Sequence, residues 1–469
     1  MLFNSLEFIA FFIIFFLAYW YLFAKNLKVQ NIFLLLSSYL FYGWWDWRFL
    51  SLIIASSVLD FCIGNGIHST DNQKNKKLLL WISVFFNLGM LGFFKYFNFF
   101  ADSLIQLLNL VGLESNPVLL NIILPVGISF YTFQTLGYTV DVYREKIKPS
   151  DNLIQFMCFV CFFPQLVAGP IERAKDLLHQ FNEKRIFRFE TAKSGIRIFL
   201  WGMFLKVVIG EICGYEAREV FSNYEDYNSS QLLLNPMFYI VHIYGDFAGY
   251  SFMAIGLARL LGFKLSQNFD YPFFSRNISE LWQKWHISLN RWFTEYLYIP
   301  LGGNRKTGFF HYRNILLTFA ICGFWHGAKW GTIVWGLIHG IHYVIWHLLK
   351  GERLKTDRTL ALSNLPKYLF VFVFFSLSMV VFYFPHLIES FNYFKQIFLN
   401  LDTPINEFNW LVLGLLIGLF IIEGMNLHKE HPLMIERFPG YLRWTIYLAI
   451  TFSILQFFDI EREFFYFQF

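Results

Sequence analysis

The sequence predicts an all-α protein that crosses a membrane many times. Of its 469 residues, 56% are hydrophobic and only 15% are charged, whereas about 25% of the residues of a typical soluble domain are charged. The chain also contains 61 Phe residues, and a soluble fold could not cover that much apolar surface with polar groups. Apolar stretches recur along the whole chain, several of them near the roughly 20 residues that span a bilayer as a helix.

We expect about twelve membrane-spanning helices, some of them short. They lie near residues 5–23, 31–45, 49–67, 78–94, 119–140, 198–213, 234–258, 312–325, 330–349, 366–385, 409–425 and 443–458. The first is expected to be retained, because it lacks a basic leader and a cleavage site. Residues 152–170 are apolar but end in Pro164, Gly169 and Pro170, which favours a re-entrant element. No repeat or linker divides the chain, so a single membrane domain over 1–469 is expected.

Loop charges predict the orientation, because Lys and Arg favour the cytoplasmic side of a cell membrane. Basic residues gather at 25–28, 74–77, 144–148, 173–197 and 259–313, and residues 211–228 are acidic. The N-terminus and the acidic loop are therefore expected outside, and the basic stretches in the cytoplasm. The net charge of +5 is too small and dispersed to indicate a nucleic-acid partner, but the basic inner face suits anionic lipid headgroups.

The cysteines and most of the histidines do not indicate a metal site. Cys158 and Cys161 form a C-x-x-C inside the apolar run MCFVCFFP, where two buried apolar side chains are favoured over a redox pair. His339, His342 and His347 share one helix without a carboxylate nearby, so a metal site is not favoured. We therefore expect no metal and no bound cofactor.

Ionisable residues inside apolar segments are expensive and often mark a polar cavity or pathway. Asp141 ends one span, Lys206 lies in GMFLKVVIG, and Asp246 lies in IYGDFAGYS. For Lys206 and Asp246, a satisfied contact between helices or a snorkelling side chain is an equal alternative.

Residues 280–298, ELWQKWHISLNRWFTEYLY, have the pattern of an interfacial helix. At 100° per residue, one face carries the charged residues Glu280, Lys284, Arg291 and Glu295, and the other carries Trp282, Trp285, Leu289, Trp292 and Tyr296. We expect the charged face in the cytosol. His286 lies on the border, one turn from Asn290, where a hydrogen-bonded structural role is favoured on periodicity alone.

A second histidine follows an apolar span in ICGFWHGAKWG, where Trp325 and Gly327 flank His326. A histidine there can accept and return a proton if a hydroxyl or thiol is brought to it. The small residues Gly323 and Gly327 would let a substrate approach closely. Spacing alone leaves a structural role equally open.

Several long motifs together resemble the membrane-bound O-acyltransferase family. They are LPVGISFYTFQTLGYTVDVYR (124–144), CFFPQLVAGPIERA (161–174), DFAGYSFMAIGLARLLGF (246–263), LWQKWHISLNRWFTEYLYIPLGGNR (281–305) and FWHGAKWGTIVWGLIHG (324–340). They are similar to the bacterial branch that acetylates exported polysaccharides such as alginate, and the resemblance covers most of residues 30–350. Phe252 stands where that branch usually has an acidic residue, and Thr294 and Glu295 where it usually has Arg-Asp.

The resemblance implies a ring of about 10–12 tilted helices, with re-entrant and interfacial helices around a central tunnel. It implies that His326 takes the place of the family's essential histidine and His286 that of its second motif histidine. An acyl thioester, most simply acetyl-CoA, would be the donor substrate on the cytoplasmic side, and an extracytoplasmic partner would pass the acetyl group to an exported polysaccharide. His326 would be a general base or hold the acetyl group transiently.

The remaining candidate residues lie in the motifs quoted above or close to them in sequence. We expect substrate contacts from Trp285, Asn290, Trp325, Gly327 and Asp246. Phosphate contacts are expected from Arg276, Lys284, Arg291, Arg305 and Lys306, for most of which solvated surface charge is the favoured alternative. Three alternative functions stay open: a transporter or flippase, D-alanyl-type transfer to a cell-envelope polymer, and an inactive scaffold subunit.

Overall fold

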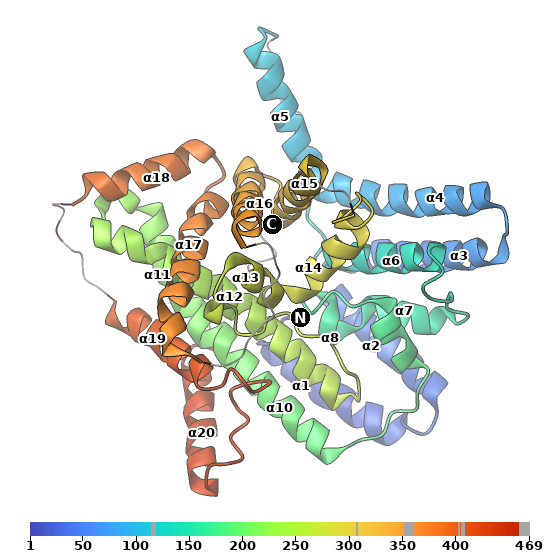
Figure 1. The fold of residues 1–469 in the computed structure, drawn as a ribbon. Coiled ribbons are helices and arrows are strands. Elements are labelled where there is room, and N and C mark those ends of the chain that lie inside the picture. The colour runs from blue at the N-terminus through green and yellow to red at the C-terminus, as the bar shows by residue number, and fades with distance from the viewer. Residues whose placement is uncertain (114–118, 306–307, 351–359, 402–403, 405–408, 459–469) are drawn as a thin grey trace. The chain divides into compact units, whose positions relative to one another are not determined.

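The structure is a computed structural model and describes residues 1–113, 119–305, 308–350, 360–401, 404 and 409–458. Within these residues every regular element is a helix, and none is a strand (Figure 1). The prediction of an all-α chain is therefore confirmed for the described part. The contacts divide the chain into two compact units, one formed by Met1–Phe189 with Ala258–Leu265 and the other by Glu190–Leu257 with Ser266–Gln468. The single membrane domain, the ring and the tunnel stay predictions.

The first unit is a bundle of apolar helices whose interior contains a cluster of polar side chains around Asp60. Its helices are α1 (Leu6–Leu17), α2 (Leu27–Asp46), α3 (Leu50–Ser69), α4 (Gln73–Leu91), α5 (Phe97–Leu110), α6 (Ile128–Tyr143), α7 (Leu153–Cys161), α8 (Phe163–Leu166) and α9 (Ala174–Leu177). Helices α3, α4 and α6 pack against one another. Asp60 of α3 accepts hydrogen bonds from Asn87 of α4, at 2.7 Å, and Thr139 of α6, at 3.0 Å. These bonds satisfy a carboxylate that would otherwise be costly to bury.

The second unit contains the two motif histidines. Its helices are α10 (Phe189–Phe204), α11 (Glu211–Ser222), α12 (Ser229–Leu260), α13 (Ile278–Lys284), α14 (Ile287–Phe293), α15 (Phe309–His326), α16 (Trp330–Lys350), α17 (Leu365–Tyr383), α18 (Leu387–Leu399), α19 (Trp410–Gly424) and α20 (Gly440–Gln456). Helices α15 and α16 form an antiparallel pair, α16 packs against α17, and α13 lies against α16. The unit therefore places the motif segment α13–α14 beside the end of α15.

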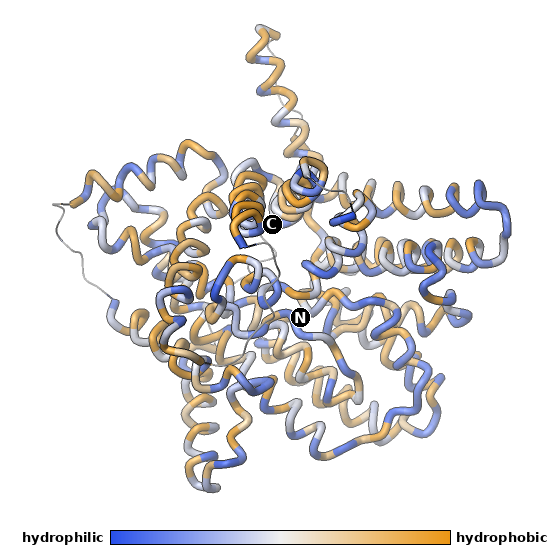
Figure 2. Tube along the Cα trace, viewed as in Figure 1, coloured by the Kyte–Doolittle hydropathy of each residue, from blue (hydrophilic) through white to orange (hydrophobic). Residues whose placement is uncertain are grey.

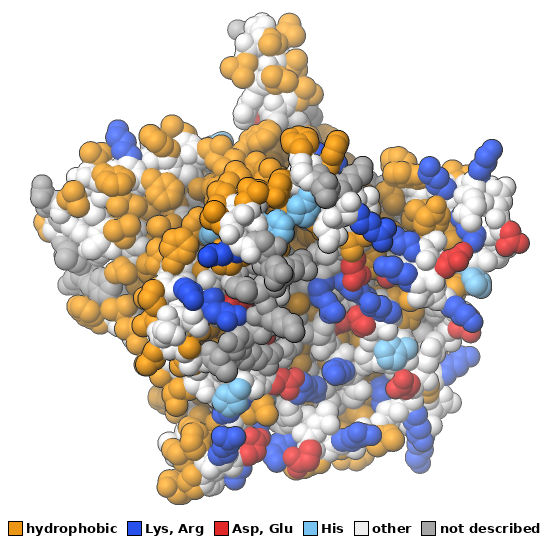
Figure 3. Space-filling model, viewed as in Figure 1, with side chains coloured by type: hydrophobic (Ala, Val, Ile, Leu, Met, Phe, Trp, Pro, Cys, Tyr) orange, Lys and Arg blue, Asp and Glu red, His pale blue; other side chains and the backbone are white. Residues whose placement is uncertain are grey.

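All twelve predicted spans contain helix, and most bounds agree within a few residues. The stretches Leu27–Ser69, Gln73–Leu110, Trp330–Lys350 and Leu362–Tyr383 are long and apolar enough to cross a membrane, and Leu6–Leu22 and Trp410–Gly424 are shorter apolar helices. Figure 2 shows hydrophobic residues along most of α16 and α17 and hydrophilic residues in the turn between α3 and α4. Phe391 and Phe398 of α18 are exposed, and Figure 3 shows hydrophobic side chains gathered on the surface around α18, as expected for a surface that faces lipid.

Two details of the predicted spans were wrong. The span expected over 119–140 begins only at Ile128, because Gly127 before it has a left-handed φ of 73° that interrupts the helix. Helices α5 and α18 lie outside the predicted spans, and both are short and amphipathic, with apolar residues on one face and polar residues on the other. In the expected re-entrant segment, α7 ends at Cys161, and α8 begins after a break at Phe162.

Candidate functional site

The segment 280–298 is interrupted at the motif histidine, so the prediction of one continuous helix is wrong. Trp285 is extended, and His286 has a left-handed φ of 44° between α13 and α14. The chain on either side of the break is held by the segment before it: Asp270 N donates to the Lys284 carbonyl at 3.0 Å, and Ile287 N donates to the Asn268 carbonyl at 2.9 Å. These bonds replace helical bonds that the break removes, because buried backbone groups need partners.

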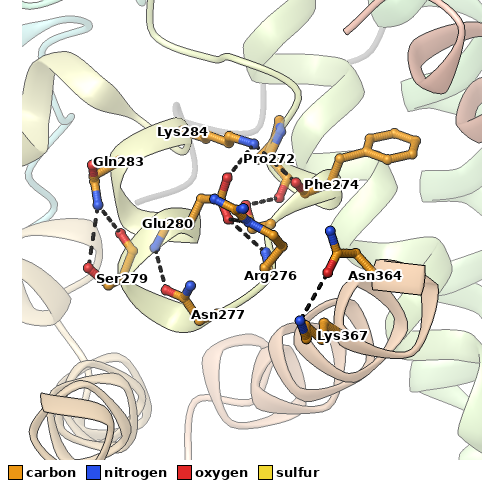
Figure 4. Close-up of polar contacts among 11 residues, drawn as sticks. Pro272, Phe274, Arg276, Asn277, Ser279, Glu280, Gln283, Lys284, Asn364 and Lys367 are labelled. Atoms are coloured by element: carbon orange, nitrogen blue, oxygen red, sulfur yellow. Dashed lines mark hydrogen bonds and ion pairs between the residues drawn. The ribbon is translucent and has the colours of Figure 1, made fainter. Parts of the chain in front are cut away.

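The prediction that the charged face of this segment is exposed to the cytosol is also wrong for Glu280 and Lys284. Glu280 and Lys284 are buried, and they pair at 3.0 Å. Arg276 Nε lies 2.9 Å from the same carboxylate, and Lys284 Nζ also donates to the Phe274 carbonyl at 3.0 Å (Figure 4). Burial alone would raise the pKa of Glu280, but Lys284 and Arg276 outweigh it and hold the pKa below its ordinary value. The ions therefore anchor α13 internally, while Arg291 of α14 and Arg305 are exposed and Lys306 lies outside the described residues.

The structure brings the two predicted histidines together. The ring centroids of His286 and His326 lie 6.1 Å apart, and the two residues are 1% and 5% exposed. His326 is the last residue of α15, because Gly327 after it is extended. Both histidines therefore lie at helix ends: His286 directly before α14, and His326 at the end of α15.

Aromatic side chains enclose this histidine pair. Phe247 of α12 contacts His286 with a centroid distance of 4.6 Å, and Trp325 lies 6.0 Å from His286 and 5.0 Å from His326. Trp335 of α16 and Phe382 of α17 contact His326 at 5.6 and 6.0 Å. Burial and the nearby His326 lower the pKa of His286 well below its ordinary value. The neutral imidazole of His286 is therefore favoured at neutral pH.

Trp285 and Asn290 stabilise the break itself. The Trp285 ring packs between Phe269, at 5.1 Å, and Phe375, at 4.9 Å. Asn290 Nδ2 donates to the carbonyls of Trp282 and Trp285 at 2.8 and 2.6 Å. Asn290 therefore caps the backbone groups that α13 leaves exposed at its end.

Asp246 and Lys206 form a buried ion pair between α12 and the π-helical segment Leu205–Gly210. This contact is the satisfied interhelical contact that the sequence left as an alternative. Asp141 lies 3.6 Å from Lys146 in the first unit, and Gly327 accepts a hydrogen bond at its carbonyl from Thr332 at 2.7 Å.

A cavity of about 630 Å³ lies in the second unit beside the histidine pair. Its lining comes from α13 to α16 and the turn after α14, and it includes Trp282, Asn290, Cys322, His311 and His347. The Trp282 ring, which is part of the lining, contacts Trp335 at 5.9 Å, and Trp335 contacts His326 at 5.6 Å, so a chain of two indoles connects the cavity wall to His326. The described lining contains hydroxyl, amide and imidazole groups but no carboxylate, ammonium or guanidinium group.

Sequence reasoning did not find the polar residues of the cavity other than Asn290. Tyr298 Oη lies 3.1 Å from His311 Nδ1, and the His311 ring lies 5.2 Å from that of His347. These three residues come from three elements, so no local spacing could have indicated them. Among the described residues, no group of three or more His, Cys, Asp or Glu side chains could hold a metal ion, and Cys158 and Cys161 are buried free thiols.

Comparison with known proteins identifies relatives for most of the chain. The model of the membrane-bound O-acyltransferase family matches residues 41–384. The chain is 37% identical over 411 residues to the probable alginate O-acetylase AlgI of Azotobacter vinelandii, covering 87% of this chain and 80% of that protein. It is 37% identical over 370 residues to the peptidoglycan O-acetyltransferase of Helicobacter pylori, covering 73% and 69%. A teichoic acid D-alanyltransferase of Streptococcus thermophilus is 30% identical over 317 residues, covering 61% and 74%.

Proposed function

Because this chain belongs to the membrane-bound O-acyltransferase family, and is thus a multi-pass membrane enzyme that uses an acyl donor, we propose that it transfers acetyl groups from acetyl-CoA toward hydroxyls of an exported polysaccharide. Its site is the facing pair His286 and His326. The relatives named for acetylation act on alginate and on peptidoglycan, which are both glycans outside the cytoplasm. We place the protein in the cytoplasmic membrane for this reason.

In the proposed reaction His326 is the general base. Its imidazole takes the proton of the acceptor hydroxyl while the hydroxyl oxygen attacks the thioester carbonyl. The new C–O ester bond forms, the C–S bond breaks, and the proton held by His326 returns to the leaving thiolate. His286 stays near the carbonyl and orients it, and a buried site with few waters strengthens that interaction. The neutral state favoured for His286 suits orientation by an N–H group.

The cavity, whose described lining has no carboxylate, ammonium or guanidinium group, is the proposed site of the donor's pantetheine arm. That arm contains amide and hydroxyl groups but no ionic group, and the lining supplies amides, hydroxyls and aromatic rings. The phosphates of coenzyme A would lie outside this cavity, where the exposed Arg291 offers a guanidinium. Arg276 and Lys284 are engaged with Glu280, so their proposed part in phosphate binding is secondary.

An extracytoplasmic partner is proposed because a polymer cannot reach the buried His326. Alginate and peptidoglycan chains are much wider than an acetyl group, so the first acceptor would be a hydroxyl that enters the site. That acceptor would then pass the acetyl group to the polymer outside the membrane. The basic loops, predicted to be cytoplasmic, support entry of the acetyl-CoA donor from the cytoplasmic side.

The experiment that tests the proposal replaces His326 by Ala and measures acetate released by mild base from surface polysaccharide. We expect loss of nearly all acetyl ester at equal membrane abundance. His242→Ala is the matched control, because His242 is another buried imidazole of the same unit, hydrogen-bonded to the Gly210 carbonyl at 2.8 Å. Unchanged acetylation in the His326 variant would overturn the proposed function.

A second measurement examines His286 through the rate at increasing acetyl-CoA concentration. Asn is the suitable replacement, because it tolerates a left-handed φ better than Ala does. We expect His286→Asn to lower the maximal rate or the apparent affinity for the donor. If both stay at their original values, the orienting role is wrong.

A further inference from the structure

A buried carboxyl group lies close to the His286 break but outside the part of the chain that the family model matches. Glu423 is near the end of α19, is 1% exposed, and follows the matched residues 41–384. Its Oε1 accepts a hydrogen bond from the Tyr244 hydroxyl of α12 at 2.5 Å. Its Oε2 has no hydrogen-bond partner among the described residues. A carboxyl group left half satisfied in an apolar interior is costly, so it needs a reason.

Tyr244 connects this carboxyl group to the motif segment. The Tyr244 ring contacts Phe269 at 5.5 Å, Phe273 at 4.9 Å and Trp285 at 6.2 Å. Phe269 lies between Asn268 and Asp270, whose backbone groups hold both sides of the break. A hydrogen bond that fixes the Tyr244 ring therefore also fixes the rings that pack around Trp285.

Residues one turn from Tyr244 on α12 and one turn from Glu423 on α19 extend this packing to His286 and to Phe273. Phe247 is one turn after Tyr244 on α12, and its ring touches Phe269 at 5.2 Å and His286 at 4.6 Å. On α19, Phe420 stacks on Phe273 at 5.6 Å, one turn before Glu423. The packing around the break is thus anchored from both α12 and α19.

We propose that Glu423 is a positioning residue for acyl transfer: by accepting the Tyr244 hydroxyl proton in a hydrogen bond, it fixes the aromatic packing that holds Trp285 and His286 in place. The role rests on the proposed function of the histidine pair. It gives α19, which no family motif covers, a part in the reaction. The hydrogen bond acts through packing, and neither residue touches the reacting atoms.

Three variants separate this role from a general effect on folding. Tyr244→Phe removes the donor, and Glu423→Leu removes the acceptor. Glu423→Gln keeps an oxygen that can accept from the hydroxyl. The matched control is Tyr393→Phe, because the Tyr393 hydroxyl is also fully buried in this unit and donates to the Leu232 carbonyl at 2.7 Å.

The assay uses membranes containing the full chain and radiolabelled acetyl-CoA, and it counts the base-labile ester formed at each donor concentration. We expect Tyr244→Phe and Glu423→Leu each to lower kcat by about tenfold or more, because small displacements of reacting groups are costly, while KM for acetyl-CoA stays within about twofold. The double variant should be no slower than the slower single variant, because both remove one interaction. Glu423→Gln should keep most of the rate.

The outcomes distinguish failure of this proposal from failure of the proposed function. Loss of rate in His326→Ala together with unchanged kcat in Tyr244→Phe and Glu423→Leu would overturn the positioning role alone. Equal loss in the Tyr393→Phe control at equal abundance would also overturn it, because any buried tyrosine bond would then have the same effect. Retained rate in His326→Ala would overturn the proposed function itself.

Discussion

Replacing Gly331 by Ala should disturb the histidine pair without touching it. Gly331 lies in the first turn of α16, and a Cβ atom added there would meet the Val381 carbonyl oxygen at 2.5 Å and the Phe384 carbonyl oxygen at 2.8 Å. The first distance is about 0.9 Å short of the 3.4 Å at which ordinary van der Waals contact begins. Both are backbone atoms, so a side-chain rotation cannot relieve the clash. Helix α16 and the end of α17 must move apart instead.

The displacement reaches His326 because both helices contact its ring. Phe382 lies between the two carbonyl groups that the new methyl would meet, and its ring is 6.0 Å from that of His326. Trp335, one turn after Gly331, is 5.6 Å from the same ring. Overpacking of this kind costs about 1–3 kcal/mol of stability, and a displacement approaching 1 Å at a reacting group costs about tenfold to a hundredfold in rate.

The assay is acetyl ester formed per unit of protein in membranes, with the melting temperature measured on the same preparation. Gly414→Ala is the control, because a Cβ at Gly414 meets nothing within 4 Å. It should leave the rate unchanged and should not lower the melting temperature, because alanine favours a helix more than glycine does. Gly331→Ala should lose at least about tenfold in rate. A variant that retains full rate would refute the argument that contacts from α16 and α17 hold His326.

Two further predictions concern the motif segment. Lys284→Met should lower the free energy of unfolding by about 1.5–3 kcal/mol, because it removes one of the charged partners of the buried Glu280 carboxylate while Arg276 still pairs with it. A loss below about 1 kcal/mol in chemical denaturation would contradict the internal role of this pair. Because the pKa of His286 is lowered from 6.5 in the folded chain, the unfolded chain binds more protons, and stability should fall as the pH drops below about 6.5, by up to about 1.4 kcal/mol per pH unit. His286→Asn should reduce this slope in thermal unfolding between pH 7 and 5, and identical slopes would contradict the buried neutral ring.

The sequence was most informative where a helix is long and apolar. Hydropathy alone located α2, α3, α16 and α17, because burial of such stretches depends on composition and length. The prediction failed at α13–α14. Residues 280–298 do have a helical periodicity, but the backbone leaves the helical conformation at Trp285 and His286. That break depends on hydrogen bonds from residues 268–270, and no pattern within the segment reveals them.

The histidine pair itself was predictable in identity but not in geometry. The motif resemblance selected His286 and His326, and the structure places both of their rings in contact with the same indole, that of Trp325. Charge patterning misled at Glu280 and Lys284, because opposite charges one turn apart can neutralise each other and become buried as a pair. The burial of Glu423 was missed for a related reason. A single carboxyl group near the end of an apolar helix usually indicates that the helix ends in solvent, and only the structure shows its hydrogen bond with Tyr244 of α12.

The aromatic rings around the pair also bear on the electrical resistance of the membrane. An enzyme that holds a polar reaction centre among membrane-spanning helices must not become an ion leak. A proton or sodium ion that reached His326 would meet Trp325, Trp335 and Phe382, and it would have to give up its hydration shell between these rings. An uncharged thioester or hydroxyl loses far less on the same path. At the proposed reaction centre, this enclosure would let acyl chemistry proceed in a membrane that keeps its potential.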